Sequence, residues 1–268
     1  MNAKIGKSEE TILKQRHFRT IMRTEAAIIK AILAQGWAYP EMLYIDCNAG
    51  PGTYLLNNQH IEGSPIIALE EMIAADIPFK AHLIEIDESR EQKLLQVVNQ
   101  RFHCPNRVRI YLGDSNEILS TIKCQESQFG ILYSDPNATC PGIPALRRWY
   151  RDSSTKRIDW LLHIGFAGIK RAVDVRCQKC PEFKGSLHHC FAGIKKHLSV
   201  QQEARGCWQW TFLLGCNDDI LNRKFSSIGF VNGKDAETCL RDLSQIKSRI
   251  GSSQHKGMDY EPGDLFVN

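Results

Sequence analysis

The chain has 268 residues, 43% of them hydrophobic, so it is long and apolar enough to bury one large core. Its 34 basic and 30 acidic residues leave a formal net charge of +4, and no stretch approaches the ~20 apolar residues that a membrane-spanning helix needs. These features favour a soluble globular protein and exclude a membrane partner.

The start of the chain, Met1 to Glu10, is charged and lacks the apolar core of a signal peptide. We therefore expect a cytoplasmic protein whose ten cysteines, scattered along a sizeable chain, are reduced. The predicted organisation is one domain over residues 1–250, with an insertion at 176–190, followed by a C-terminal tail over residues 251–268.

The first predicted element is a helix over Thr20 to Gln35, where apolar residues recur at helical spacing before Gly36. Five basic residues lie between Lys14 and Arg23, near the edge where a ligand would enter. Two interpretations of this basic segment stay open: a solvated helix face, or a lid that contacts nucleic acid.

A buried strand followed by a glycine-rich turn is predicted from Leu43 to Tyr54. Asp46 ends the strand, and Gly50 and Gly52 let the backbone turn tightly without placing a side chain in a ligand's way. The loop is AGPG instead of GxGxxG and no Walker lysine follows, which disfavours a phosphate-bearing cofactor. An acid before such a loop suits an amine-bearing cofactor, S-adenosylmethionine (SAM); the alternative is an ordinary turn.

Three further predicted strands also end in acidic residues, at Glu85, Asp114 and Asp135. The strands cover residues 81–87, 107–112 and 129–133, and the helices between them give βαβ spacing. Parallel strands present their carboxyl ends at one edge, so these acids are expected to surround one ligand. Glu85 could accept hydrogen bonds from the ribose hydroxyls of an adenosine, and the alternative is that it caps the following helix. Asp114 with Ser115 could hydrogen-bond the adenine edge, and the alternative is an N-cap for the next helix.

Together these motifs resemble class I SAM-dependent methyltransferases and, within that group, the bacterial three-Cys-motif partner proteins. The resemblance covers roughly residues 10 to 165 and rests on Asp46, Ala49 to Gly52, Tyr54, Gly63 to Leu69, Glu85, Asp114 and Asp135-Pro136. It implies an α/β, Rossmann-like sheet of seven strands in the order 3-2-1-4-5-7-6, with helices on both faces and an antiparallel last strand.

The resemblance also implies SAM as the cofactor. Our candidate cofactor-binding residues are Asp46, Asn48, Ala49, Gly50, Gly52, Glu85, Asp114 and Ser115, with Asp135 on the same side of the site.

The residues after the fourth predicted strand bear most on the reaction. Methyltransferases that act on the amino groups of bases place a [DNS]PP[YFW] motif here, whose first side chain holds the target amine. This chain keeps Asp135 and Pro136 but has Asn137 and Ala138 where the second proline and the aromatic residue would stand. Asp135, Pro136 and Asn137 are the candidate catalytic residues; a strand-to-helix turn is the alternative.

A basic segment follows, because Ala145 to Val200 contains 12 Lys and Arg but only 4 Asp and Glu. As it comes after the fourth strand, we expect it to flank the catalytic edge, where a basic rim suits a polyanion. The candidate substrate-binding residues are Arg147, Arg148, Trp149 and Tyr150, whose rings would stack on a base. A solvated charged face is the alternative.

Inside this segment, a CxxC is followed by His-His-Cys within 14 residues. These are zinc-ligand residue types, so a zinc site is a candidate, and a loop with reduced cysteines is the alternative. The candidate ligands are Cys177, Cys180, His188 and Cys190.

The later predicted elements are a fifth strand over Arg157 to Ile164, two strands over Trp208 to Leu214 and Phe225 to Val231 in a hairpin-like arrangement, and a helix over Lys234 to Ile250. The function expected from the whole is a SAM-dependent methyltransferase of nucleic acid, DNA or RNA, acting on an exocyclic base amine, with N6 of adenine favoured. The alternatives are methylation of a small-molecule or protein amine, and a non-catalytic SAM-binding accessory protein.

Overall fold

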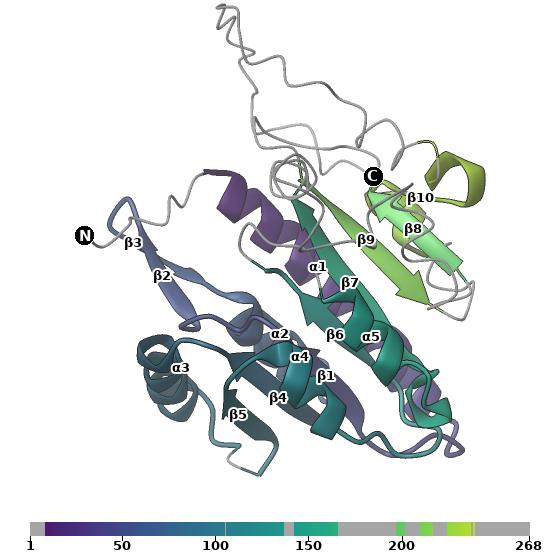
Figure 1. Cartoon of the computed structure of the whole chain (residues 1–268), viewed down its shortest axis with the longest axis horizontal. Helices are drawn as coiled ribbons and strands as arrows, with labels where there is room; N and C mark the ends of the chain where they lie inside the picture. Colours follow the sequence, from purple (N-terminus) through teal and green to yellow (C-terminus); the bar gives the residue numbers. More distant parts are fainter. Residues whose placement is uncertain are drawn as a thin grey trace, which may run out of the picture.

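A computed structural model describes residues 9–104, 106–136, 142–165, 197–201, 210–216, 224–236 and 238. Within this part the centre is an eight-stranded sheet in the order β10-β8-β9-β7-β6-β1-β4-β5 (Figure 1). Its strands are β1 (Met42–Asp46), β4 (Phe79–Glu85), β5 (Val108–Leu112), β6 (Gly130–Ser134), β7 (Ile158–Gly165), β8 (His197–Gln201), β9 (Trp210–Cys216) and β10 (Phe230–Asn232).

The strand order confirms the predicted Rossmann-like methyltransferase sheet. The first seven strands of this sheet, numbered along the chain, lie in the order 3-2-1-4-5-7-6. Strands β5, β4, β1, β6 and β7 are parallel, and β9 lies antiparallel between β7 and β8. Strand β10 adds an eighth member, antiparallel to β8.

The final strands differ from the prediction in their pairing. The sequence suggested that the strands beginning near Trp208 and Phe225 form a hairpin, but β9 pairs with β7 and β8, and β10 pairs with β8. Strand β8 was not predicted because it is only five residues long and follows two lysines in the basic segment. It nevertheless has four buried residues, which explains its place inside the sheet.

Helices cover both faces of the sheet. On one face lie α1 (Glu9–Leu33), α2 (Ser64–Ala74) and α3 (Glu88–Arg101), which share one buried apolar cluster with the strands. On the other face lie α4 (Ser115–Ile118), the 3-10 turn η1 (Leu119–Thr121) and α5 (Ile143–Trp149), in front of the strands in Figure 1. Two more short 3-10 turns are η2 (Ser153–Thr155) and η4 (Ser226–Ile228).

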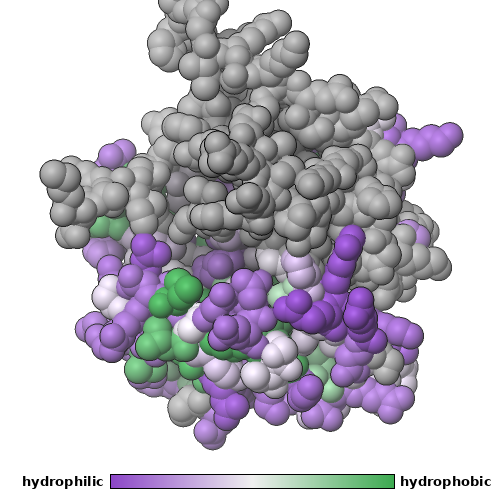
Figure 2. All heavy atoms as spheres, viewed as in Figure 1, coloured by the Kyte–Doolittle hydropathy of each residue, from purple (hydrophilic) through white to green (hydrophobic). Residues whose placement is uncertain are grey.

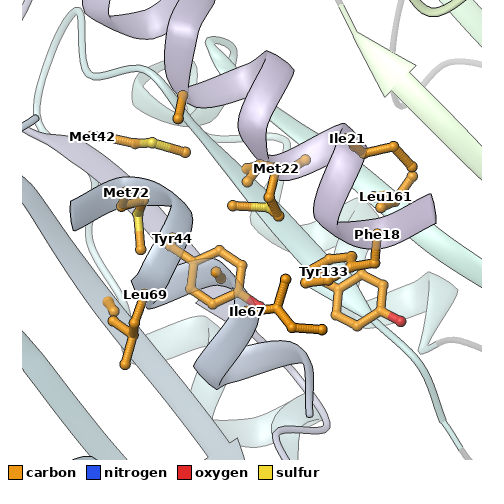
Figure 3. Packing of buried hydrophobic residues seen from close by; sticks show 14 of the residues in the cluster. Phe18, Ile21, Met22, Met42, Tyr44, Ile67, Leu69, Met72, Tyr133 and Leu161 are labelled. Carbon is orange, nitrogen blue, oxygen red and sulfur yellow. The ribbon is translucent and has the colours of Figure 1, made fainter. Parts of the chain in front are cut away.

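Helix α1 begins well before the predicted start at Thr20, because Phe18 continues its apolar face. Phe18, Ile21 and Met22 are buried, and their side chains point toward β6, β7 and α2 (Figure 3). The rings of Phe18 and Tyr133 lie 4.4 Å apart, centroid to centroid. Burial of this face stabilises the helix on the sheet.

Ion pairs also fix α1 against α2. The guanidinium of Arg19 donates hydrogen bonds to Glu70 and Glu71, each at 2.9 Å. Arg23 donates to both oxygens of Glu71, at 2.9 and 3.1 Å. Burial opposes the charge on Glu71, yet the two arginines hold its pKa below the ordinary value. Two of the five basic residues between Lys14 and Arg23 therefore serve to dock the helix.

A small hairpin, β2 (Thr53–Leu56) and β3 (Gln59–Glu62), follows the glycine-rich loop and was not predicted. The proposed insertion at 176–190 and the tail at 251–268 lie outside the described residues. Among the helices that the structure describes, none is long and apolar enough to cross a membrane.

Candidate cofactor and catalytic site

A cavity of about 850 Å³ lies at the carboxyl ends of β1, β4, β5 and β6, beside the first turns of α1. It is the place where a Rossmann-like sheet binds ligands. The structure brings together seven of the predicted site residues in its lining: Asn48, Gly50, Glu85, Asp114, Ser115, Asp135 and Pro136.

The glycine-rich loop requires glycine at two positions. Gly50 has a φ of +66° and Gly52 a φ of +77°, a region that other residues rarely adopt. A Cβ on Gly50 would lie 2.3 Å from the hydroxyl oxygen of Tyr54, so a side chain at this position would force the Tyr54 side chain to shift. The predicted tight turn is confirmed, and Tyr54 packs directly against it.

Glu85 holds this loop at the end of β4. Its carboxylate accepts hydrogen bonds from the backbone N–H groups of Gly50 at 2.8 Å and Asp87 at 2.9 Å. The N-cap of α3 is Asp87, whose side chain accepts from Arg90 N–H, so the capping role considered for Glu85 belongs to its neighbour. Each oxygen of Glu85 retains acceptor capacity toward the cavity.

Asp46 lies beneath the loop and not in the cavity lining. Its side chain is fully buried and accepts hydrogen bonds from the Tyr44 hydroxyl (2.9 Å), the Ser64 hydroxyl (2.7 Å) and Asn48 N–H (3.1 Å). Burial raises its pKa from 3.8 to about 6, against the lowering effect of these hydrogen bonds. The carboxylate supports the loop from below. Contact between Asp46 and the cofactor stays a prediction.

Two more predicted cofactor residues have the same supporting position. Ala49 is buried and its N–H donates to the carbonyl of Ile84 at 2.9 Å. Gly52 accepts a hydrogen bond from Gly63 N–H through its carbonyl, at 2.6 Å. Ala49 and Gly52 are not part of the cavity lining, and their contact with the cofactor stays a prediction.

Asp114 caps the short helix α4. Its carboxylate accepts from the backbone N–H of Asn116 at 2.8 Å and from the Asn116 side-chain amide at 2.9 Å. The capping alternative is therefore correct, and it is compatible with a ligand role because Asp114, Ser115 and Asn116 all line the cavity.

Asp135 lies between two basic side chains at the end of β6. Its carboxylate pairs with the ammonium of Lys14 from α1 and, at 2.8 Å, with Nδ1 of His163 from β7. Burial opposes the negative charge, but His163 and Lys14 outweigh it and hold the pKa of Asp135 well below its usual range. The backbone N–H of Asp135 donates to the Asn48 side-chain oxygen at 3.1 Å, which fixes β6 to the glycine-rich loop.

Lys14 and His163 were not identified as site residues from the sequence. Lys14 was part of a basic segment whose role stayed open, and 121 residues separate it from Asp135. His163 packs against the rings of Trp210 (5.4 Å between centroids) and Phe212 (5.9 Å), and its Nε2 is buried without a hydrogen-bond partner among the described residues. The available signal was its position near the carboxyl end of the fifth predicted strand.

The predicted substrate-binding residues do not line the cavity. Helix α5 starts beside the cavity at Gly142 and leads back toward the amino ends of the strands, as a crossover between parallel strands must. Trp149 is 6% exposed, and its indole N–H donates to the carbonyl of Ile122. The Tyr150 hydroxyl donates to the carbonyl of Asp159. Both side chains are thus engaged within the protein and lie away from this cavity, and stacking of these rings on a base stays a prediction.

The arginines of this segment are also displaced from the predicted edge. Arg147 and Arg148 lie in the last turn of α5. Arg157 immediately precedes β7 and lies over the rings of Trp37 (4.8 Å) and Phe129 (5.1 Å), at the amino end of the sheet. These three arginines therefore lie away from the cavity, and the basic rim beside the catalytic edge stays a prediction. The rest of the segment up to residue 196 lies outside the described residues.

Two other predictions cannot be placed. Asn137 and the candidate zinc ligands Cys177, Cys180, His188 and Cys190 lie outside the described residues, and the zinc site stays a prediction. Within the described ranges, no cluster of three or more His, Cys, Asp or Glu could hold a metal ion.

No protein-family model and no curated protein matches the chain. Among solved structures, protein LPL1258 from Legionella pneumophila is 11% identical with a TM-score of 0.51, over 81% of this chain and 96% of that one. A probable spermidine synthase from Corynebacterium glutamicum (12% identity, TM-score 0.48, 89% and 82% covered) and M. jannaschii TYW2 in complex with AdoMet (11%, 0.41, 79% and 77%) score lower.

The likeness to LPL1258 shows a shared fold alone, and the two weaker likenesses carry no argument. The resemblance to the three-Cys-motif partner proteins stays a prediction.

Proposed function

We propose that the protein is a SAM-dependent methyltransferase that acts on nucleic acid, at an exocyclic amino group of a base, with N6 of adenine favoured. One observation carries this proposal: a single cavity joins the glycine-rich loop, Glu85, Asp114 and Asp135 at the carboxyl edge of a methyltransferase-type sheet. Its volume of about 850 Å³ falls in the range of cofactor and ligand sites.

The lining residues fit SAM chemically. SAM carries a carboxylate, an ammonium and a sulfonium, and the cavity offers both signs of charge: Glu85, Asp114 and Asp135 against Lys14, Arg90 and Lys93. We assign Glu85 to the ribose hydroxyls, since its oxygens have free acceptor capacity, and Asp114 with Ser115 to the adenine edge. When bound, SAM would supply an activated methyl group, so the protein mainly has to position the nucleophile.

Asp135 is the residue proposed to hold the target amine. Because its pKa is depressed, the carboxylate is ionised at neutral pH and can accept a hydrogen bond from an amino group. Lys14 lies beside it and balances its charge, so the site does not specially attract a cationic amine. This favours the neutral amino group of a base over the ammonium of a protein lysine or a polyamine.

A second candidate is favoured by the position of Trp149 and Tyr150. Neither ring faces the cavity, and the motif after Asp135 lacks the usual second proline and aromatic residue. A methyltransferase of a small-molecule or protein amine needs no such ring, and a SAM-binding accessory protein needs no substrate contact. Both alternatives therefore remain in the experiment.

The test measures SAM affinity by calorimetry and methyl transfer from labelled SAM to RNA, DNA, protein and small amines. We expect label on nucleic acid, and we expect Asp135→Asn to stop transfer while SAM still binds. The matched control is Asp152→Asn, an exposed acid outside the cavity lining, which should leave both unchanged. SAM binding without any labelled acceptor would support the accessory protein instead, and no SAM binding would overturn the proposal.

A further inference from the structure

A second hollow, of about 540 Å³, lies toward the amino ends of β4 and β5, and its lining shares no residue with the first cavity. Lys80 and His82 from β4 and Arg109 and Tyr111 from β5 line it. Alternate residues of a strand point to the same face, and His82 is in register with Arg109. The four side chains therefore form one patch on the face of the sheet that carries α4 and α5.

The hollow exists because the connection after β5 is short. Helix α4 has 4 residues and η1 has 3, whereas α3, which follows β4, has 14. A helix of four residues is about 6 Å long and cannot cover the length of two strands. The sheet face near the amino ends of β4 and β5 is left open, at the edge of the sheet (Figure 1).

Positive charge surrounds this hollow. Lys80, Arg107, Arg109 and Lys123 are all exposed in its lining, whereas Glu41 is its one acidic residue and pairs with Lys80 at 3.0 Å. In the part of the chain that the structure describes, the other three cations form no salt bridge. Figure 2 views this face and shows hydrophilic side chains beside a hydrophobic patch in the region of α3, β4 and β5.

The wall of the hollow is apolar and aromatic. Leu43 and Ile122 are buried in its lining, and the ring of Tyr111 is stacked on His82 with 5.7 Å between centroids. The Tyr111 hydroxyl and His82 Nδ1 are 2.8 Å apart. Burial lowers the pKa of His82 to about 4, so at neutral pH the ring adds polarizable surface and no charge.

We propose that this hollow binds single-stranded nucleic acid, with backbone phosphates on Arg109 and Lys123 and one nucleotide in the hollow. A cationic rim around an aromatic wall is the chemistry that single strands recognise. A duplex keeps its bases stacked inside the helix and has no base to insert. That the bound strand is also the methyl acceptor rests on the proposed function; the binding itself does not.

The test is fluorescence anisotropy with labelled single-stranded DNA and RNA of about 12 nucleotides, without SAM, over a range of salt concentrations. The double variant Arg109→Ala, Lys123→Ala removes two phosphate contacts. By counterion release it should flatten the slope of log affinity against log salt by about 1.4, which corresponds to roughly 25-fold weaker binding at about 0.1 M salt.

The control variant Lys30→Ala, Lys234→Ala loses the same charge from exposed positions outside the hollow, and should bind like the unaltered protein. Equal losses in the two variants, or no loss in either, would overturn the proposal. Tighter binding of a duplex of the same sequence would overturn the assignment to single strands.

Two separate measurements keep the two proposals apart: strand binding in the absence of SAM, and methyl transfer from labelled SAM. If labelled SAM transfers no methyl group to nucleic acid while binding still depends on Arg109 and Lys123, the proposed function fails and the binding surface stands. If methyl transfer to nucleic acid occurs but strand affinity is the same with and without Arg109 and Lys123, the proposed binding surface is wrong and the proposed function stands.

Discussion

Replacement of Asp46 by Asn should change how the stability of the protein depends on pH. The Asp46 carboxyl is fully buried, and its pKa is raised from 3.8 to about 6 because burial disfavours the charged form. A raised folded-state pKa means that the protonated carboxyl stabilises the fold at low pH. This contribution is lost as pH rises from about 4 through 6, and the difference between the two pKa values corresponds to about 3 kcal/mol.

Urea unfolding of the unaltered protein and of Asp46→Asn at several pH values between about 4 and 7 measures this effect. The amide cannot ionise, so between pH 4 and 7 the free energy of unfolding of the variant should rise by about 2 kcal/mol relative to that of the unaltered protein. This change with pH is expected even if the two proteins differ in stability at pH 4. Because each protein is compared with the other at the same pH, the titration of all other groups cancels to first order.

Two outcomes would refute the reasoning. If the two stability curves run parallel from pH 4 to 7, the carboxylate is not destabilised by burial. If the variant loses stability relative to the unaltered protein as pH rises, the sign of the shift is wrong. The variant Ser64→Ala offers a further check: its hydroxyl donates to the charged carboxylate, so its removal should extend the loss of stability to higher pH.

Three further predictions concern single residues. Gly50→Ala should abolish SAM binding in calorimetry, whereas Gly36→Ala, also at positive φ but in open space, should cost only about 1–2 kcal/mol of stability and leave binding unchanged. Phe18→Ala should destabilise the fold by about 3–5 kcal/mol in denaturant unfolding. Lys14→Met should cost about 1.5–3 kcal/mol at pH 7, and this difference in stability should narrow only as the pH falls well below about 4, because the pKa of Asp135, which Lys14 helps to depress, lies well below its usual range.

The sequence predicted the local features of the site well. Apolar runs that end in acid marked four parallel strands, and the structure places Glu85, Asp114 and Asp135 around one cavity. No local sequence pattern reveals how deeply a residue is buried beneath a loop, so the sequence could not separate Asp46 from the acids that line the cavity. The β2–β3 hairpin did have a signal in the sequence, the pair Asn57-Asn58. Both residues have positive φ, as a two-residue hairpin turn requires.

Long-range pairing set the limit of prediction elsewhere. The contact of Lys14 and His163 with Asp135 joins the first helix, β6 and β7, and no spacing in the sequence encodes it. The position of Arg147 and Arg148 away from the cavity has a different cause. The residues after a strand were assumed to stay at its carboxyl edge, but a crossover helix carries its last turn to the opposite edge of the sheet.

The position of α1 bears on how fast the cavity can admit a ligand. Lys14 is one turn before Phe18, so the two side chains lie on the same face of the helix. Displacement of α1 would expose Phe18, Ile21 and Met22, each of which contributes about 1.5–3 kcal/mol by burial, and the sum approaches the whole stability of a domain. Rotation of the Lys14 side chain needs no such exposure. We therefore expect access to Asp135 to open on the nanosecond timescale of side-chain motion, too fast to limit turnover.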